Sequence, residues 1–145
     1  MHLDKYSVFT DDRHSTYEFL SEGTKVNIKK FVNYQQLNEH VFNLAFGDWD
    51  EVQQEIDDNV RTNNKDRDKV LATVACTVMN FMQYHPDAVV FAEGSTPAKT
   101  RLYQMGINSH WHPVSSLFEV EGFRNGAWEP FERGKNYEAF AVRAK

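Results

Sequence analysis

The chain has little of what would set it apart from ordinary globular proteins. It contains one cysteine, Cys76, so no internal disulfide can form, and only seven glycines and four prolines in 145 residues. These low counts exclude a disulfide-rich scaffold, a collagen-like chain and a disordered chain. No apolar run approaches the roughly 18 residues of a membrane-spanning helix, and residues 1–12 lack the apolar core of a secretory signal. We therefore expect a cytoplasmic protein that does not enter membranes.

The net charge and the length limit which partners the protein can bind and how many domains it can form. The formal net charge is −5 at pH 7, which argues against general attraction to polyanions and leaves room for a local basic pocket. With 41% hydrophobic and 14% aromatic residues, the chain can build one packed core of ordinary size. No repeats, linkers or low-complexity tracts divide it, and we expect one domain over residues 1–145.

Two regions of the chain carry the patterns of antiparallel strands. The predicted strands are 15–21, 24–34 and 40–46 in the amino-terminal third, and 117–123, 127–132 and 137–143 near the carboxyl terminus. Glu22-Gly23 and Asn125-Gly126 separate neighbouring strands, and Asn-Gly is the strongest short hairpin signal. The sequence thus predicts an amino-terminal meander and carboxyl-terminal hairpins.

Residues 67–84 carry the clearest helical signal, because apolar residues recur there at helical spacing. The apolar stripe consists of Val70, Leu71, Val74, Ala75, Val78, Phe81 and Met82. The opposite side carries Lys69, Thr73, Cys76, Asn80 and Gln83. This pattern predicts a helix that covers a face of the sheet, with Cys76 as a bystander on its polar side.

The stretch AVVFAEGSTPAKTRLYQMGI, residues 88–107, predicts a strand, a tight turn and a helix. Residues 88–92 form an apolar run typical of a strand buried on both faces. Thr96 before Pro97 is a helix start, because the hydroxyl caps free backbone N–H groups and proline suits the first helical position. We expect a helix over about residues 97–106. Its buried side should hold Ala98, Leu102 and Met105, and its opposite side Thr96, Thr100 and Tyr103.

Two cations lie in the first turn and a half of this helix, where the helix dipole favours negative charge. Lys99 and Arg101 can reach back to the preceding turn, because helical side chains lean toward the amino-terminal end. An anion bound there would remove the conflict. The predicted anion site therefore consists of the turn residues Gly94, Ser95 and Thr96 and both cations, with the backbone N–H groups of Ser95 and Thr96 as donors. The alternative is that both cations simply face solvent.

Four residues are candidates for proton transfer at this site: Glu93, Tyr103, His110 and His112. Glu93 follows the strand, where α/β proteins often hold a catalytic acid or base, although a solvated turn residue fits equally. The two histidines flank Trp111 and suit general acid–base work or the wall of an aromatic pocket. Since no third ligand accompanies them, we do not predict a zinc site.

The acidic segment 47–69 raises the question of a divalent cation. Its carboxylates Asp48, Asp50, Asp57 and Asp58 are of the kind that hard cations prefer. Their spacing matches no known metal loop. We therefore predict a solvated connection, with one short helical or extended piece around 51–56, and neither a metal nor another cofactor.

Four segments resemble the motifs of a family of short, functionally uncharacterised bacterial proteins, a domain of unknown function. They are FGDWD (46–50), NNKDRDKVLATVA (63–75), EGSTPAKTRLYQ (93–104) and GKNYEAFAVRAK (134–145). The resemblance covers most of the chain, and the GST-x-A-x-TRLY element is its most specific part. It implies a free-standing single-domain protein and carries no activity, catalytic residue or ligand with it.

These observations favour an α+β fold in which a mainly antiparallel sheet holds residues 88–92 as an inner strand and two principal helices pack on it. Two functions remain. The first is a pocket that binds a phosphorylated small molecule, a nucleotide or an RNA phosphate at residues 94–101, with or without catalysis; a small RNA-cutting toxin is one version. The second is a noncatalytic interaction module or regulatory subunit, pairing through a sheet edge or an aromatic patch that includes Trp49 or Trp128. The sequence leaves open a homo-oligomer and a protein partner such as an antitoxin.

Overall fold

The computed structural model describes residues 5–23, 27–50, 52–53, 55–57 and 66–145, and its described residues form nine strands and three helices. The strands are β1 (Phe9–Thr10), β2 (Thr16–Glu22), β3 (Asn27–Gln36), β4 (Val41–Asp50), β5 (Glu55–Asp57), β6 (Val89–Ala92), β7 (Phe118–Arg124), β8 (Ala127–Pro130) and β9 (Ala139–Ala144). The helices are α1 (Arg67–Tyr84), α2 (Pro97–Ser109) and α3 (Trp111–Leu117). The predicted α+β class is confirmed.

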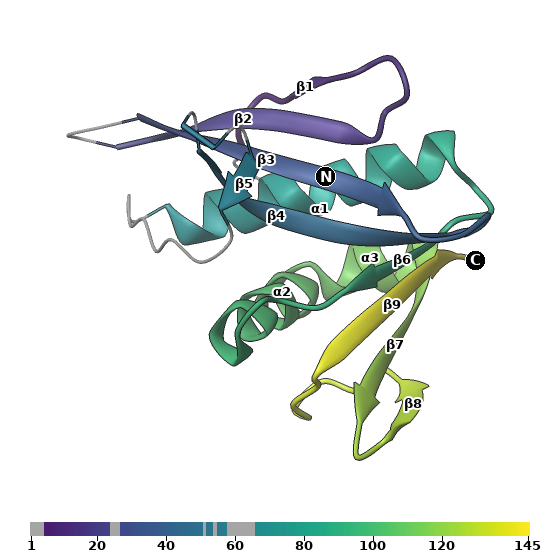
Figure 1. The fold of residues 1–145 in the computed structure, drawn as a ribbon. Coiled ribbons are helices and arrows are strands. Elements are labelled where there is room, and N and C mark those ends of the chain that lie inside the picture. Colours follow the sequence, from purple (N-terminus) through teal and green to yellow (C-terminus); the bar gives the residue numbers. More distant parts are fainter. Residues whose placement is uncertain (1–4, 24–26, 51, 54, 58–65) are drawn as a thin grey trace.

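One sheet contains all of these strands, in the order β1-β2-β3-β4-β6-β9-β7-β8, with β5 paired to β4 off this path (Figure 1). Every pairing is antiparallel except that of β4 with β6. A parallel pair needs a long crossover connection, and α1 lies in it. The strand order places β6 inside the sheet, between β4 and β9. Its residue Val90 is only 1% exposed. The predicted inner strand is confirmed.

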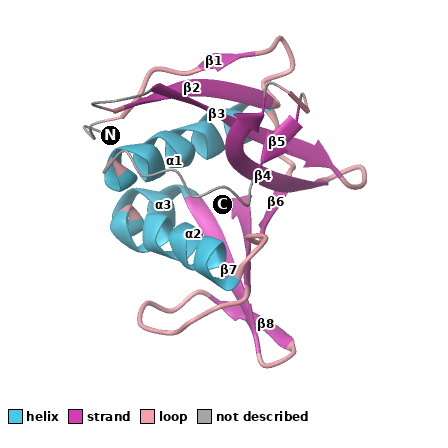
Figure 2. Cartoon of the chain, turned by 60° about the vertical axis from the view of Figure 1, so that its left-hand side comes forward, coloured by secondary structure: helices cyan, strands magenta, loops and turns pink. Residues whose placement is uncertain are grey.

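The helices all pack against the same face of the sheet (Figure 2). Alternate residues of the strands point into this layer, which is why the most deeply buried side chains come from β2, β3 and β9 as well as from α1. They include Tyr17, Phe19, Val32, Phe81 and Phe140. The opposite face of the sheet carries no helix from the described residues.

The buried side of α1 is wider than its apolar stripe. Thr73, predicted on the polar side, is fully buried, as is Thr77. Both positions are satisfied by hydrogen bonds: Thr73 Oγ1 accepts one from the amide of Tyr6 at 2.8 Å, and Thr77 Oγ1 lies 2.8 Å from the hydroxyl of Tyr34. The prediction for Thr73 was wrong because small hydroxyl residues can enter a core when partners meet them.

The predicted buried side of α2 was also wrong. The buried residues are Thr100, Tyr103 and Gln104, while Ala98, Leu102 and Met105 are only half-buried. Gln104 accounts for the rotation of the helix, because its side-chain amide donates to the carbonyl of Lys135 and accepts from the amide of Tyr137. Apolar periodicity alone cannot detect a helix face fixed by a polar clamp.

Three features of the fold are not predicted from the sequence: strand β1, the extension of β4 and helix α3. β4 continues past residue 46 to Asp50, and its last residues pair with β5. The sequence gives no indication of α3, which begins directly after α2 and contains Pro113 in its first turn, where proline is tolerated.

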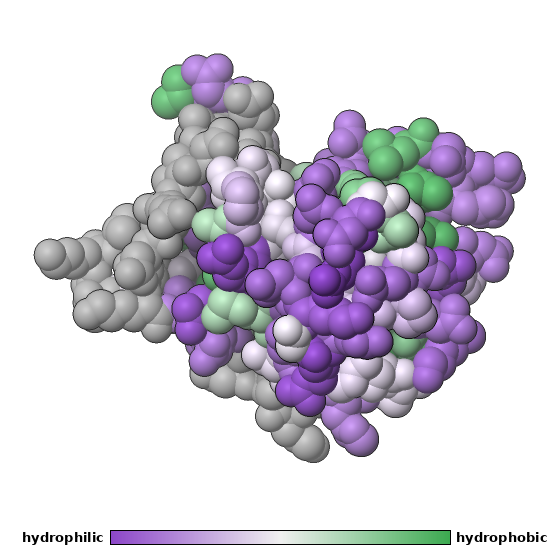
Figure 3. All heavy atoms as spheres, turned by 90° about the horizontal axis from the view of Figure 1, so that it is seen from below, coloured by the Kyte–Doolittle hydropathy of each residue, from purple (hydrophilic) through white to green (hydrophobic). Residues whose placement is uncertain are grey.

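The molecule seen from below presents mainly hydrophilic residues, with hydrophobic ones gathered toward one side (Figure 3).

Among the described residues, no helix is both long enough and apolar enough to cross a membrane.

Candidate functional site

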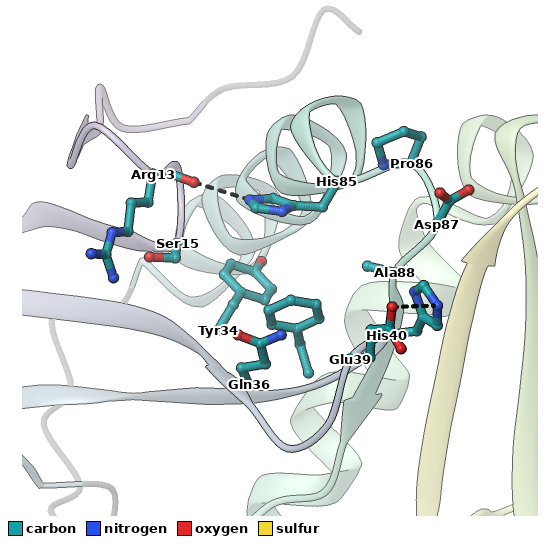
Figure 4. A pocket seen from close by; sticks show the side chains of 11 residues that line it. Arg13, Ser15, Tyr34, Gln36, Glu39, His40, His85, Pro86, Asp87 and Ala88 are labelled. Carbon is teal, nitrogen blue, oxygen red and sulfur yellow. Dashed lines mark hydrogen bonds and ion pairs between the residues drawn. The ribbon is translucent and has the colours of Figure 1, made fainter.

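A polar pocket of about 520 Å³ opens where the β1–β2 connection, the β3–β4 turn and the α1–β6 connection meet (Figure 4). The residues that line it are Arg13, Ser15, Tyr34, Gln36, Glu39, His40, Phe42, His85, Pro86, Asp87 and Ala88. Basic, acidic and aromatic groups from distant parts of the chain thus share one concave surface. This combination is typical of ligand sites.

The loop that carries Arg13 is held from within by Asp11. The carboxylate of Asp11 accepts hydrogen bonds from the amides of Ser15 at 2.9 Å and Thr16 at 3.1 Å, and from the Ser15 hydroxyl at 3.2 Å. Burial opposes ionisation, but these hydrogen bonds outweigh it and lower the pKa of the Asp11 carboxyl. His14 completes the turn with a φ of 52°, in the left-handed region that side chains other than glycine rarely adopt. The backbone next to Arg13 is therefore tightly fixed.

His85 fastens the same loop from the other side of the pocket. Its Nε2 donates to the carbonyl of Arg13 at 3.0 Å. A carbonyl only accepts, so Nε2 carries a proton, and whenever the ring is neutral its lone pair is on Nδ1. The ring stacks on Phe81 at 4.4 Å between centroids and lies 5.7 Å from the ring of Phe42. Both its position and its tautomer are thus set by the fold.

An aromatic wall lines the inner side of the pocket. Tyr34 stacks on Phe81 at 4.2 Å between centroids, and Phe42 meets Phe81 edge-on at 5.0 Å. Burial raises the pKa of Tyr34 well above its ordinary value, against a smaller lowering by its hydrogen bond with Thr77. Tyr34 is therefore a neutral wall residue and does not supply an anion or a ready proton acceptor.

The pocket has two ends of different charge (Figure 4). One end presents Arg13 and Ser15, from the β1–β2 connection. The other presents Glu39, His40 and Asp87, which are all exposed. There, Nε2 of His40 lies 3.9 Å from Oε1 of Glu39. A ligand that spans the pocket would meet a cation at one end and hydrogen-bond acceptors at the other.

The turn before α2 has the geometry that the sequence predicts. Thr96 caps the helix by accepting from the amide of Lys99 at 3.1 Å, and Pro97 takes the first helical position. The amide of Gly94, however, donates to Oγ1 of Thr100 at 3.0 Å and so serves the turn itself. A Cβ atom at Gly94 would lie 2.4 Å from the amide nitrogen of Thr100, which explains the need for glycine there.

A second pocket, of about 320 Å³, opens at this turn, and its charged lining residues are Glu93, Arg101 and Glu138. Lys99 does not line it, and its Nζ lies 5.2 Å from the ring centroid of Phe46. Ser95 and Thr96 do line it. Of the two predicted cations, only Arg101 therefore lines the pocket at the turn, where it lies with the carboxylates of Glu93 and Glu138.

The other candidates for proton transfer lie away from this turn. Tyr103 is buried in the core. His110 follows the last residue of α2, where its Nδ1 donates to the carbonyl of Gly106 at 2.8 Å, and His112 is exposed on α3. The 13 residues of α2 span about 20 Å at 1.5 Å per residue. Of the four candidates, only Glu93 is at the turn.

The acidic segment does not form a metal centre in the part of the chain that the structure describes. No group of three or more histidine, cysteine or carboxylate side chains is arranged there to hold a metal ion. Asp48 is buried and bonded to Nζ of Lys30 at 2.5 Å. The side chains of Asp50 and Asp57, and residue 58 as a whole, fall outside the described residues.

Arg13, His40 and His85, the most distinctive residues of the larger pocket, carry no local pattern that predicts a site. Each is an isolated polar residue in a connection, without a motif around it. The available signal was their position, because ligand-binding side chains concentrate in loops that a rigid scaffold holds. Their convergence depends on contacts between segments far apart in the sequence, which no local pattern reveals.

Comparison with protein-family models gives a match over nearly the whole chain. The model of a family of unknown function (DUF6934) matches residues 2–145. The chain therefore belongs to this family, which confirms the expected membership of an uncharacterised domain family. Neither the curated proteins nor the solved structures contain a match to it.

Proposed function

We propose that this member of a family of unknown function binds a small phosphorylated ligand in the larger pocket, with Arg13 as the cation that meets the phosphate. One observation carries the proposal: Arg13, His40 and His85, from three separate connections, line one concave site with an aromatic inner wall. Arginine is suited to phosphate because its planar guanidinium can donate two parallel hydrogen bonds.

The loop that holds Arg13 supports this choice. Asp11 and His85 fix its backbone from two sides, so that little backbone freedom is lost when Arg13 meets a ligand. The turn at Gly94 offers less to an anion. Its single lining cation, Arg101, shares the smaller pocket with Glu93 and Glu138, whose negative charges would oppose the binding of a phosphate. In the larger pocket the two carboxylates lie on the side opposite Arg13.

Proton transfer at a bound ligand would fall to His85 and His40. Nδ1 of His85 is the lone-pair nitrogen of a ring held in place by Arg13 and Phe81. His40 is at the other end of the pocket, next to Glu39. Two imidazoles on one site are suited to act as base and acid without a metal.

A thermal-shift series tests the binding site, because a ligand that binds only the folded protein raises its melting temperature. The probes are inorganic phosphate, pyrophosphate, ribose 5-phosphate and AMP. We expect at least one of them to raise the melting temperature of the wild type. Arg13→Ala should weaken binding about 10- to 100-fold, the scale of a lost charge-assisted hydrogen bond.

Matched variants locate the effect. Arg133→Ala removes an equally exposed arginine away from the pocket and should leave the response unchanged. Arg101→Ala probes the turn at Gly94. A response that survives in Arg13→Ala and disappears in Arg101→Ala would move the site to that turn. The absence of a response to any phosphorylated probe would reject the proposed function.

A second candidate, an interaction module, is favoured by one feature of the helix-free face. Trp128, on the edge strand β8, is 42% exposed and lies 6.0 Å from the ring of Phe91 and 5.3 Å from that of Phe123. Trp49, the other predicted contact, instead packs edge-on against Phe31 at 4.5 Å. Light scattering measures the molar mass of the wild type and of Trp128→Ala in solution. The interaction module requires that the wild-type protein self-associates and that the substitution weakens this association.

A further inference from the structure

We propose that the ligand of the larger pocket is a nucleotide whose base carries an exocyclic amino group. This inference rests on the proposed function, since it places the phosphate at Arg13. The base would lie along the aromatic wall and its amino group would face Glu39 and Asp87. Size, wall chemistry and the placement of charge each point in this direction.

The size of the pocket is the first reason. Its volume of about 520 Å³ lies within the range of sites for small organic ligands. A phosphate ion alone would fill a small part of it. The ligand must therefore carry a body that occupies the space between Arg13 and Asp87.

The chemistry of the inner wall describes that body. His85 is half-buried and presents a ring whose position is held by Phe81 and by the carbonyl of Arg13. Tyr34 and Phe42 line the same pocket beside it, but they are only 3% and 9% exposed, so the ring of His85 provides the accessible surface of this wall. Rings of this kind stack on the planar bases of nucleotides, whatever the base. A sugar phosphate without a base would leave the wall unused.

The separation of charge gives the orientation. Figure 4 shows Arg13 and Ser15 on one side of the pocket and Glu39, His40 and Asp87 on the other. Ionised carboxylates only accept hydrogen bonds, so the acidic end suits a group that donates them. Adenine, cytosine and guanine carry exocyclic amino groups, and hypoxanthine and uracil do not. Gln36, which also lines the pocket, can both donate and accept at a base edge.

Paired nucleotides test the inference, because IMP carries an oxo group where AMP carries the amino group, as UMP does relative to CMP, and in both cases the neighbouring ring nitrogen becomes an N–H donor. Titration calorimetry with the wild type should show that AMP binds about tenfold more tightly than IMP, or CMP than UMP. Tenfold is the scale of one hydrogen bond to a charged group. Ribose 5-phosphate should bind more weakly than either favoured nucleotide.

Variants then connect the preference to residues. Glu39→Gln or Asp87→Asn should reduce the ratio of affinities for AMP and IMP, or for CMP and UMP, toward one. Glu132→Gln, an exposed glutamate outside the pocket, should leave that ratio unchanged. Arg13→Ala should weaken AMP and IMP by the same factor, since both carry the phosphate.

The outcomes separate this inference from the function on which it rests. Equal affinities within both nucleotide pairs, together with equal affinity for ribose 5-phosphate, would overturn the nucleotide assignment and leave the phosphate site intact. A preference for amino-bearing bases that neither carboxylate variant reduces would overturn the assigned orientation. Failure of every phosphorylated probe to bind the wild type would reject the proposed function itself.

Discussion

Nε2 of His85 donates a hydrogen bond to the backbone carbonyl of Arg13, 3.0 Å away and 72 residues earlier in the chain. This contact joins the carboxyl-terminal end of α1 to the β1–β2 connection. It closes one side of the larger pocket and fixes the tautomer of a histidine that lines it. One hydrogen bond therefore contributes both to the stability of the fold and to the shape of the pocket. The substitution His85→Phe removes this bond and keeps an aromatic ring at the position.

His85→Phe should loosen the loop around Arg13 while the new ring still stacks on Phe81. We expect a loss of about 0.5–1.5 kcal/mol in the free energy of unfolding, the usual net value of a hydrogen bond. The amides of Ser15 and Thr16 should exchange with deuterium faster, since local opening exposes them. His112→Phe, at an exposed position on α3, is the control. Unchanged exchange at both amides would show that Asp11 alone holds the loop.

Two glycines should respond to alanine in opposite directions. Gly106 lies inside α2, and a Cβ atom there would meet only ordinary contacts with Leu71, at 3.7 and 3.8 Å. Gly106→Ala should therefore raise the free energy of unfolding by about 0.5–1 kcal/mol, through the lower entropy of the unfolded chain. Gly94→Ala should lower it by more than about 1 kcal/mol, because its Cβ would lie 2.4 Å from the amide nitrogen of Thr100. Urea denaturation measures both, and a neutral Gly94→Ala would contradict the tight turn.

Removing one partner of the buried ion pair between Lys30 and Asp48 should lower the free energy of unfolding strongly. Nζ of Lys30 lies 2.5 Å from the carboxylate, and both side chains are 11% exposed. Lys30→Met should cost about 3–5 kcal/mol, because it removes the partner of a buried charge. The double variant Lys30→Met, Asp48→Leu should cost less than the single one, since no charge remains. A double variant that loses the sum of both single effects would mean that the two residues do not depend on each other.

Stability should decline in alkaline solution because of two buried tyrosines. Burial raises the pKa of Tyr17 to about 12 and that of Tyr34 well above its ordinary value. A pKa raised by folding contributes stability that is complete below the unfolded value, near pH 10, and is lost as the pH rises through the folded value. The free energy of unfolding should therefore fall between about pH 10 and about pH 12.

Tyr17→Phe tests the first of these residues. It loses the hydrogen bond from Tyr17 to Oδ1 of Asn80, so the variant should be less stable at pH 8, and its stability should then decline less steeply above pH 10. Tyr84→Phe, at a residue that is 53% exposed, is the matched control and should keep the slope of the wild type. Equal slopes in wild type and Tyr17→Phe would contradict the role assigned to burial.

The elements that the sequence predicts well are those with local signals. The strand, turn and helix of residues 88–107 follow from an apolar run, from Gly94 and from the Thr96-Pro97 cap, all of which act within a few residues. The rotation of α2 could not be predicted in this way. It depends on Gln104 meeting the backbone at Lys135 and Tyr137, about 30 residues away, and no periodicity records such a contact.

The candidate site was harder to predict than the fold. The cations Lys99 and Arg101 are close in sequence, yet they diverge, because Lys99 extends over Phe46 while Arg101 lines the smaller pocket. Arg13 and His85 are far apart in sequence, yet they meet. Two residues that are close along a helix thus need not share a site. Connections that the sheet brings together are better candidates, although they lie far apart in the sequence.

An NMR titration of the ¹⁵N-labelled protein with AMP tests the location of the ligand site most directly. We predict that the largest changes in amide chemical shift fall on residues 13–16, 36–40 and 85–88, which surround the larger pocket. In Arg13→Ala the same changes should require about 10- to 100-fold more AMP. Changes concentrated at residues 93–101 and 136–138 would place the anion at the turn before α2 instead. Changes at neither set of residues would contradict a phosphate-binding function for this pocket.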